Sequence, residues 1–246
     1  MNSWQSQQQC CMQLFFDYHN SSHVVQFYVD GKEGIMLIET ESLRVFLSPP
    51  YANLTSEKVF ENVWKKEGRI FSLIPKTSFI SCQWSDLPHM DYGVISYQWK
   101  TKLEHIVKFA LGVDGSPNPM RSKYIWLDIG CLNQLDGNRM TTIQRSAEIY
   151  YHAKEYHLIE VGSLRRGWVL FELSSVPKTL IPITHFTTSD ANMLNMAKAT
   201  FKRGGFEGCK FSKESDRILV RKKILEKYED MQAFNNKIAA IVDTLL

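Results

Sequence analysis

The stretch YIWLDIGCLNQ, residues 124–134, predicts a buried strand that ends at a polar loop. Its first four residues are bulky and apolar, and a carboxylate, Asp128, stands where the strand should end. Asn133 and Gln134 follow in the predicted loop. An acid and two amides at this place indicate either a binding site or a set of hydrogen bonds that hold the loop, and both interpretations stay open.

Strand-like and helix-like segments alternate on both sides of this stretch. The expected strands are 92–99, 124–129, 156–162 and 179–186, and the expected helices are 101–113, 141–153 and one that starts at Ser163 as its N-cap. Such alternation predicts a parallel sheet with helices on both faces. Because ligands bind outside the carboxyl ends of parallel strands, we expect residues 96–100, 128–134 and 162–168 to meet at one edge.

The chain divides into three predicted parts. Residues 1–85 are expected to form a β-rich N-terminal extension with one helix, residues 86–190 the α/β core, and residues 191–246 a helical segment packed on the core. In the first part, residues 23–48 hold three short β-like runs, and Asp30-Gly31 is a hairpin turn signal between the first two. Ser56 is a candidate N-cap for the helix expected at 56–68.

Composition excludes several classes of function. The 246 residues carry a net charge of +3, which is too small for a nucleic-acid surface. No apolar run approaches the length of a membrane span, and the N-terminus lacks the basic and apolar regions of a signal peptide. The five cysteines form no CxxC pair, so no metal site is expected. We therefore expect a cytoplasmic protein without nucleic-acid or membrane partners.

One carboxylate stands out in RRGWVLFEL, residues 165–173. Trp168 and Glu172 are four residues apart and share a helix face, so the indole should shield the carboxylate and raise its pKa. Arg165 and Arg166 should lower that pKa again. The alternative is a surface glutamate that precedes a core leucine.

Three blocks resemble the fungal heterokaryon-incompatibility (HET) domain. They are VISYQW (94–99), YIWLDIGCLNQLDGNRMTTIQRSAEIYYHA (124–153) and RRGWVLFEL (165–173), in the order of the family's L-S-Y-x-W, W-[IL]-D-x-x-C-I-N-Q and R-x-W-x-x-x-E-[LF] motifs. The resemblance covers about residues 92–175. The HET domain is in turn similar to the Toll/interleukin-1 receptor (TIR) fold.

This resemblance implies a flavodoxin-like α/β fold and, as in enzymatic TIR domains, hydrolysis of the bond between nicotinamide and ribose in NAD. Glu172 would be the catalytic carboxylate. The implied substrate-binding residues are Ser96, Tyr97, Gln98, Trp99, Lys100, Asp128, Asn133, Arg166 and Trp168. NAD or a related nucleotide would be the substrate, so neither a cofactor nor a metal is expected.

The resemblance also implies a role in innate immunity or regulated cell death, with activity switched on when like domains associate into an oligomer. Two other functions stay open. One is a non-catalytic module that assembles with like domains, as many TIR-fold adaptors do. The other is a transferase that processes nucleosides or nucleotides on the same scaffold, with a lone glutamate against the anomeric carbon.

Overall fold

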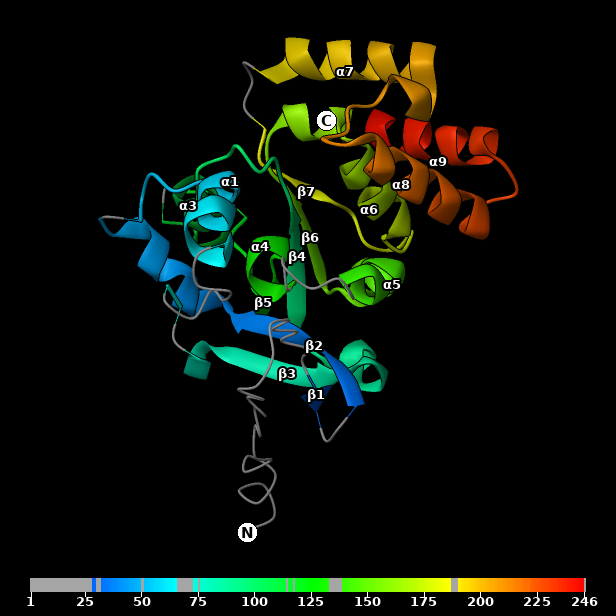
Figure 1. Cartoon of the computed structure of the whole chain (residues 1–246). Helices are drawn as coiled ribbons and strands as arrows, with labels where there is room; N and C mark the ends of the chain where they lie inside the picture. The colour runs from blue at the N-terminus through cyan, green and yellow to red at the C-terminus, as the bar shows by residue number, and fades with distance from the viewer. Residues whose placement is uncertain are drawn as a thin grey trace.

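The computed structural model describes residues 28–245 apart from 30–31, 50, 66–72, 75, 114, 117, 133–138 and 187–189. Within these residues the chain forms a mixed β-sheet flanked by helices (Figure 1). The strands are β1 (Tyr28–Val29), β2 (Lys32–Glu39), β3 (Phe79–Gln83), β4 (Tyr92–Ser96), β5 (Tyr124–Trp126), β6 (Glu155–Leu158) and β7 (Ile183–Thr184). The protein is therefore of the α/β class, as the alternating pattern predicts.

Four strands form the parallel part of the sheet, in the order β5-β4-β6-β7. All five residues of β4 are buried, as expected for a strand with neighbours on both edges and helices on both faces. In the register between β4 and β6, Ser96 faces Leu158. The predicted parallel arrangement is confirmed for these four strands.

The other edge of the sheet is antiparallel, so the prediction of a parallel sheet is wrong there. Strand β2 pairs antiparallel with β5, with β3 and with β1. Its apolar run, residues 35–38, is buried, and such a run needs partners on both edges and cover on both faces. Residues on both sides of position 86 thus share one sheet. The Asp30-Gly31 turn lies outside the described residues.

Helices cover both faces of the sheet (Figure 1). On one side lie α3 (Leu103–Leu111) and α1 (Ser56–Val59), which continues as the π-helix η2 (Phe60–Trp64). On the other side lie α5 (Arg139–His152) and α6 (Gly167–Ser175). The short helix α4 (Asp128–Cys131) follows β5 directly.

Two expected helix starts and one expected strand are wrong. The side chain of Thr55, not of Ser56, caps α1 by accepting the N–H of Lys58 at 3.2 Å. Ser163 lies in the 3₁₀-helix η5 (Val161–Arg165), and α6 begins only at Gly167. The third β-like run of the N-terminal part is the 3₁₀-helix η1 (Thr40–Leu47), because Thr40, Leu43 and Phe46 are buried at the three-residue spacing of that helix.

The remaining elements are short turns and the C-terminal helices. The turns are the 3₁₀-helices η3 (Lys76–Ser78), η4 (Trp84–His89) and η7 (Gly205–Gly208), and the helices are α7 (Ala191–Gly204), α8 (Glu214–Lys227) and α9 (Met231–Asp243). Helices α8 and α9 pack against α6 (Figure 1). Their lysines bond to the end of α6, where Lys227 and Lys237 both donate to the carbonyl of Ser174.

Candidate functional site

Three loops meet at the carboxyl edge of the sheet, between β4 and β6. The connection that leaves β4 leads to β5 on one side, and β6 lies on the other side, so this is the point where the strand order reverses. The loop after β4 bonds to Asp128, which follows β5, and to Glu160, which follows β6. Asp128 and Gly162, from two of the predicted ranges, thus lie beside the loop after β4 as expected. Glu160 lies just before the predicted range 162–168, and residues 133–134 lie outside the described residues.

Glu172 lies on α6 and reaches back to the end of β4. Its Oε2 accepts a 2.5 Å hydrogen bond from the hydroxyl of Ser96, and its side chain is only partly buried, so solvent reaches it. The surrounding protein nevertheless raises its pKa to about 7, because burial disfavours the charged form. A hydrogen bond from Ser96 lowers the pKa, the charge of Asp128 raises it, and a hydrogen bond from Tyr150 lowers it.

Three residues are expected from the sequence to tune the pKa of Glu172: Trp168, Arg165 and Arg166. Nη2 of Arg166 donates to Ser212 at 2.7 Å, so this guanidinium points to the C-terminal part of the chain. No arginine is among the groups that set the pKa of Glu172, and the expected lowering by arginine is therefore wrong. The indole of Trp168 lies edge-on to Phe171, with ring centroids 6.4 Å apart.

Asp128 anchors two aromatic side chains of the loop after β4. Its Oδ1 accepts the hydroxyl of Tyr97 at 2.5 Å, and its Oδ2 accepts the indole N–H of Trp99 at 2.6 Å. The backbone N–H of Ile129 donates to Oδ1 at 2.7 Å. Burial raises the pKa of Asp128, and these three bonds oppose that rise. Asp128 thus holds the loop after β4 by hydrogen bonds, which is one of its two predicted roles.

The N-terminal part of the chain also contributes to the site. The hydroxyl of Ser56, on α1, lies 2.7 Å from the hydroxyl of Tyr97. The ring of Phe60 lies beside the indole of Trp99, with centroids 6.0 Å apart. The sequence pattern marked Ser56 only as a helix cap, and nothing in its local spacing indicates a contact with a residue 41 positions later.

Gln98 leads to a second carboxylate, Glu160, which the sequence reasoning missed. Nε2 of Gln98 donates to Oε2 of Glu160 at 3.2 Å, and the hydroxyl of Thr101 donates to the same oxygen at 2.9 Å. Glu160 lies just past the end of β6, so the rule that singled out Asp128 also applies to it. Lys100 is exposed, and Asn133 lies outside the described residues.

Two buried tyrosines lie beside Glu172. The charge of Glu172 helps to raise the pKa of both Tyr150 and Tyr156, after the larger effect of burial. Their rings meet edge to face, with centroids 6.0 Å apart. The buried hydroxyl of Tyr156 has no hydrogen-bond partner of good geometry among the described residues. The Glu172 carboxylate therefore lies next to two aromatic side chains.

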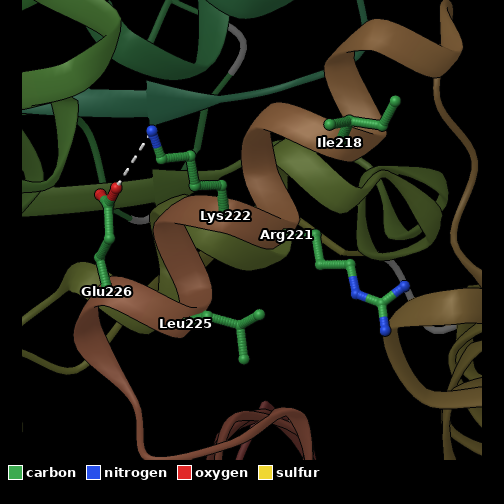
Figure 2. A pocket seen from close by; sticks show the side chains of 5 residues that line it. All are labelled: Ile218, Arg221, Lys222, Leu225 and Glu226. Carbon is green, nitrogen blue, oxygen red and sulfur yellow. Dashed lines mark ion pairs between the residues drawn. The ribbon is translucent and has the colours of Figure 1, made fainter.

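A separate shallow hollow of about 530 Å³ lies on the surface of α8 (Figure 2). It is lined by Ile218, Arg221, Lys222, Leu225 and Glu226. Figure 2 shows these side chains spread along one helix, with an ion pair between Lys222 and Glu226. Nζ of Lys222 and Oε1 of Glu226 lie 3.9 Å apart. None of the predicted site residues lines this hollow.

The described part of the chain contains no group of three or more histidine, cysteine or acidic side chains arranged to hold a metal ion. None of its helices is long and apolar enough to cross a membrane. No protein-family model matches the chain, and neither the curated proteins nor the solved structures include one that matches it.

Proposed function

We propose that this chain is a HET/TIR-like enzyme that hydrolyses NAD to nicotinamide and ADP-ribose, with Glu172 as the catalytic carboxylate. The observation that carries the proposal is the contact between Glu172 and Ser96. It places a partly buried carboxylate at the carboxyl edge of the sheet, where ligands bind in open α/β folds. The finer fold is part of the proposal, since the strand order β5-β4-β6-β7 corresponds to 2-1-3-4 of a flavodoxin-like sheet.

The chemistry needs one ionised carboxylate. The nicotinamide of NAD is cationic, so it leaves with the electron pair of its bond to C1′ of the ribose and needs no acid to protonate it. The sugar becomes positively charged as the bond breaks, and the Glu172 carboxylate stabilises that charge. Water then adds to C1′ and loses a proton, which gives ADP-ribose.

The loop after β4 supplies the walls of the proposed substrate site. Asp128 holds the indole of Trp99 by its N–H, and aromatic faces attract cations such as the nicotinamide ring. Lys100 is exposed at the end of this loop and is suited to the diphosphate of NAD. Gln98 and Trp168 belong to the same proposed set of substrate-binding residues.

The proposal includes regulation and location. Hydrolysis of cellular NAD is toxic, so we place the activity in innate immunity or cell death and make it dependent on self-association of like domains. We place the protein in the cytoplasm, which agrees with its free cysteines at positions 82, 131 and 209.

The alternative function is a non-catalytic module that assembles with like domains. The observation that favours it is that Tyr97 and Trp99 both donate their hydrogen bonds to the Asp128 carboxylate. Such a network holds a loop without any ligand.

The test is release of nicotinamide from NAD by the purified chain, at dilute concentration and under crowding that promotes assembly. Glu172→Gln and Glu172→Ala should abolish release, while Glu226→Gln, which changes an exposed carboxylate on α8, should leave it intact. A folded wild-type chain that assembles but releases no nicotinamide would favour the interaction module.

A further inference from the structure

Glu160 has an unusual backbone. Its φ of 66° and ψ of 131° make it the one non-glycine residue with positive φ in the described part of the chain. A side chain at this conformation costs free energy that glycine would avoid. Such outliers persist where the surroundings enforce them, and they cluster at ligand-binding and catalytic sites.

The side chain of Glu160 is anchored on one oxygen. Its Oε2 accepts the hydrogen bonds of Gln98 and Thr101, and both donors come from the loop after β4. Its Oε1 accepts no hydrogen bond from the residues that the structure describes. A carboxylate has about four acceptor positions, so the anchored group keeps free capacity for a ligand.

Glu160 lies just past the end of β6, at the point where the strand order reverses. Ser96 and Leu158 face each other at the ends of β4 and β6. Gln98 and Glu160 each lie two residues beyond the end of their strand. Gly162 leaves room for this contact, because a Cβ there would lie 2.3 Å from Nε2 of Gln98. Carboxylates at the carboxyl edge of such sheets accept hydrogen bonds from ribose hydroxyls.

We propose that Glu160 is a second ligand-binding carboxylate of this site and accepts a hydrogen bond from a ribose 2′-hydroxyl of the bound dinucleotide. The inference rests on the proposed cleavage of NAD and specifies what the site recognises. The strained backbone holds the carboxylate at the carboxyl edge of the sheet, Gln98 and Thr101 fix one oxygen, and the other oxygen faces the ligand. Glu172 acts on the breaking bond, and Glu160 contributes to binding.

The test measures NAD binding by calorimetry in a Glu172→Gln background, which does not consume the ligand. Glu160→Gly removes the carboxylate and suits the backbone, so NAD affinity should fall at least tenfold while the chain stays folded, because the relieved backbone strain offsets part of the two lost hydrogen bonds. Glu160→Gln keeps one acceptor oxygen and should lose less affinity. The control Glu226→Gln should bind NAD as the background protein does.

Two analogues of NAD identify the hydroxyl. One lacks the 2′-hydroxyl of the nicotinamide ribose, and the other lacks that of the adenosine ribose. For the analogue without the recognised hydroxyl, Glu160→Gly should cause no further loss of affinity. Glu160→Gly could weaken the binding of NAD and of both analogues equally, or could weaken the binding of none of them. In either case the carboxylate contacts neither hydroxyl and the inference is overturned.

The outcomes separate this inference from the proposed function. If wild-type protein releases nicotinamide and Glu160→Gly changes neither KM nor NAD affinity, only the role of Glu160 fails. If NAD binds in a Glu160-dependent way but is not cleaved, the cleavage fails and the ribose contact stands. If NAD does not bind at all, both are overturned. If the proposed function and the role of Glu160 are both correct, Glu160→Gly raises KM about tenfold and changes kcat little.

Discussion

The hydroxyl of Ser96, the last residue of β4, donates a 2.5 Å hydrogen bond to Glu172, which lies 76 positions later on α6. The bond joins the central strand of the parallel sheet to the helix that carries the proposed catalytic group. It favours the ionised form of a carboxylate that burial would otherwise keep protonated. The balance between these two effects leads to the first three predictions.

The rate of NAD cleavage should depend on the ionisation of Glu172. Its pKa is about 7 and the reaction uses the charged form, so kcat/KM should rise with pH and reach half of its plateau near pH 7. The measurement is nicotinamide release between pH 5 and 9. A rate that is already on its plateau at pH 5 would contradict the role given to Glu172.

Ser96→Ala should move that midpoint to higher pH. The hydroxyl of Ser96 lowers the pKa of Glu172, and a hydrogen bond to a charged group is worth about 1.5–3 kcal/mol, or roughly one to two pKa units. Ser96→Thr keeps a hydroxyl and serves as the conservative control. The pH profile of kcat/KM for the three proteins is the readout, and identical midpoints would show that the bond does not tune Glu172.

The free energy of unfolding should fall as pH rises from about 4.5 to 7. The folded-state pKa of Glu172 is raised from its ordinary 4.5 to about 7, so the native state binds more protons than the unfolded state in this window. Because solvent reaches this side chain, we expect a loss of about 1–2 kcal/mol. Urea unfolding of wild type and Glu172→Gln at both pH values measures it, and the variant should lack this component.

Asp128→Asn should destabilise the loop after β4. The carboxylate accepts bonds from Tyr97, Trp99 and the backbone of Ile129, and an amide places a donor against one of these donors. We expect a loss of about 2 kcal/mol in the free energy of unfolding. Denaturant titration is the measurement, with Asp243→Asn on the surface of α9 as the control. Equal stability of both variants would mean that Asp128 does not hold the loop.

Gly167→Ala should destabilise the start of α6. A Cβ at Gly167 would lie 1.8 Å from the ring of Phe211, whereas a Cβ at Gly204 would meet no atom within 4 Å. We expect a loss of about 1–3 kcal/mol for Gly167→Ala and no loss from overpacking for Gly204→Ala. Thermal unfolding compares the two variants. Adding Phe211→Ala should recover part of the loss, and its failure to do so would contradict this explanation.

Local pattern in the sequence determined the parallel half of this protein. The patterns that predict strands at 92–99 and 124–129 and a helix at 101–113 act over a few residues, so the existence of β4, β5 and α3 is readable from spacing alone. The bounds are less exact, since β5 ends at Trp126 and Asp128 begins α4. The same reasoning placed Asp128 and the loop after β4 at one edge, since parallel strands end together.

Tertiary structure decided what lies around that edge. Partners that are distant in sequence decide whether β2 joins the sheet and whether Ser56 caps a helix or bonds to Tyr97. They also decide where Arg166 points. Glu160 follows an apolar strand as Asp128 does, but its positive φ and its bonds to the loop after β4 exist only in the folded chain. The spacing of residues predicts which of them lie on the same face of a helix or strand. Hydrogen bonds between residues about 40 to 80 positions apart form only when the packed core brings the two partners together.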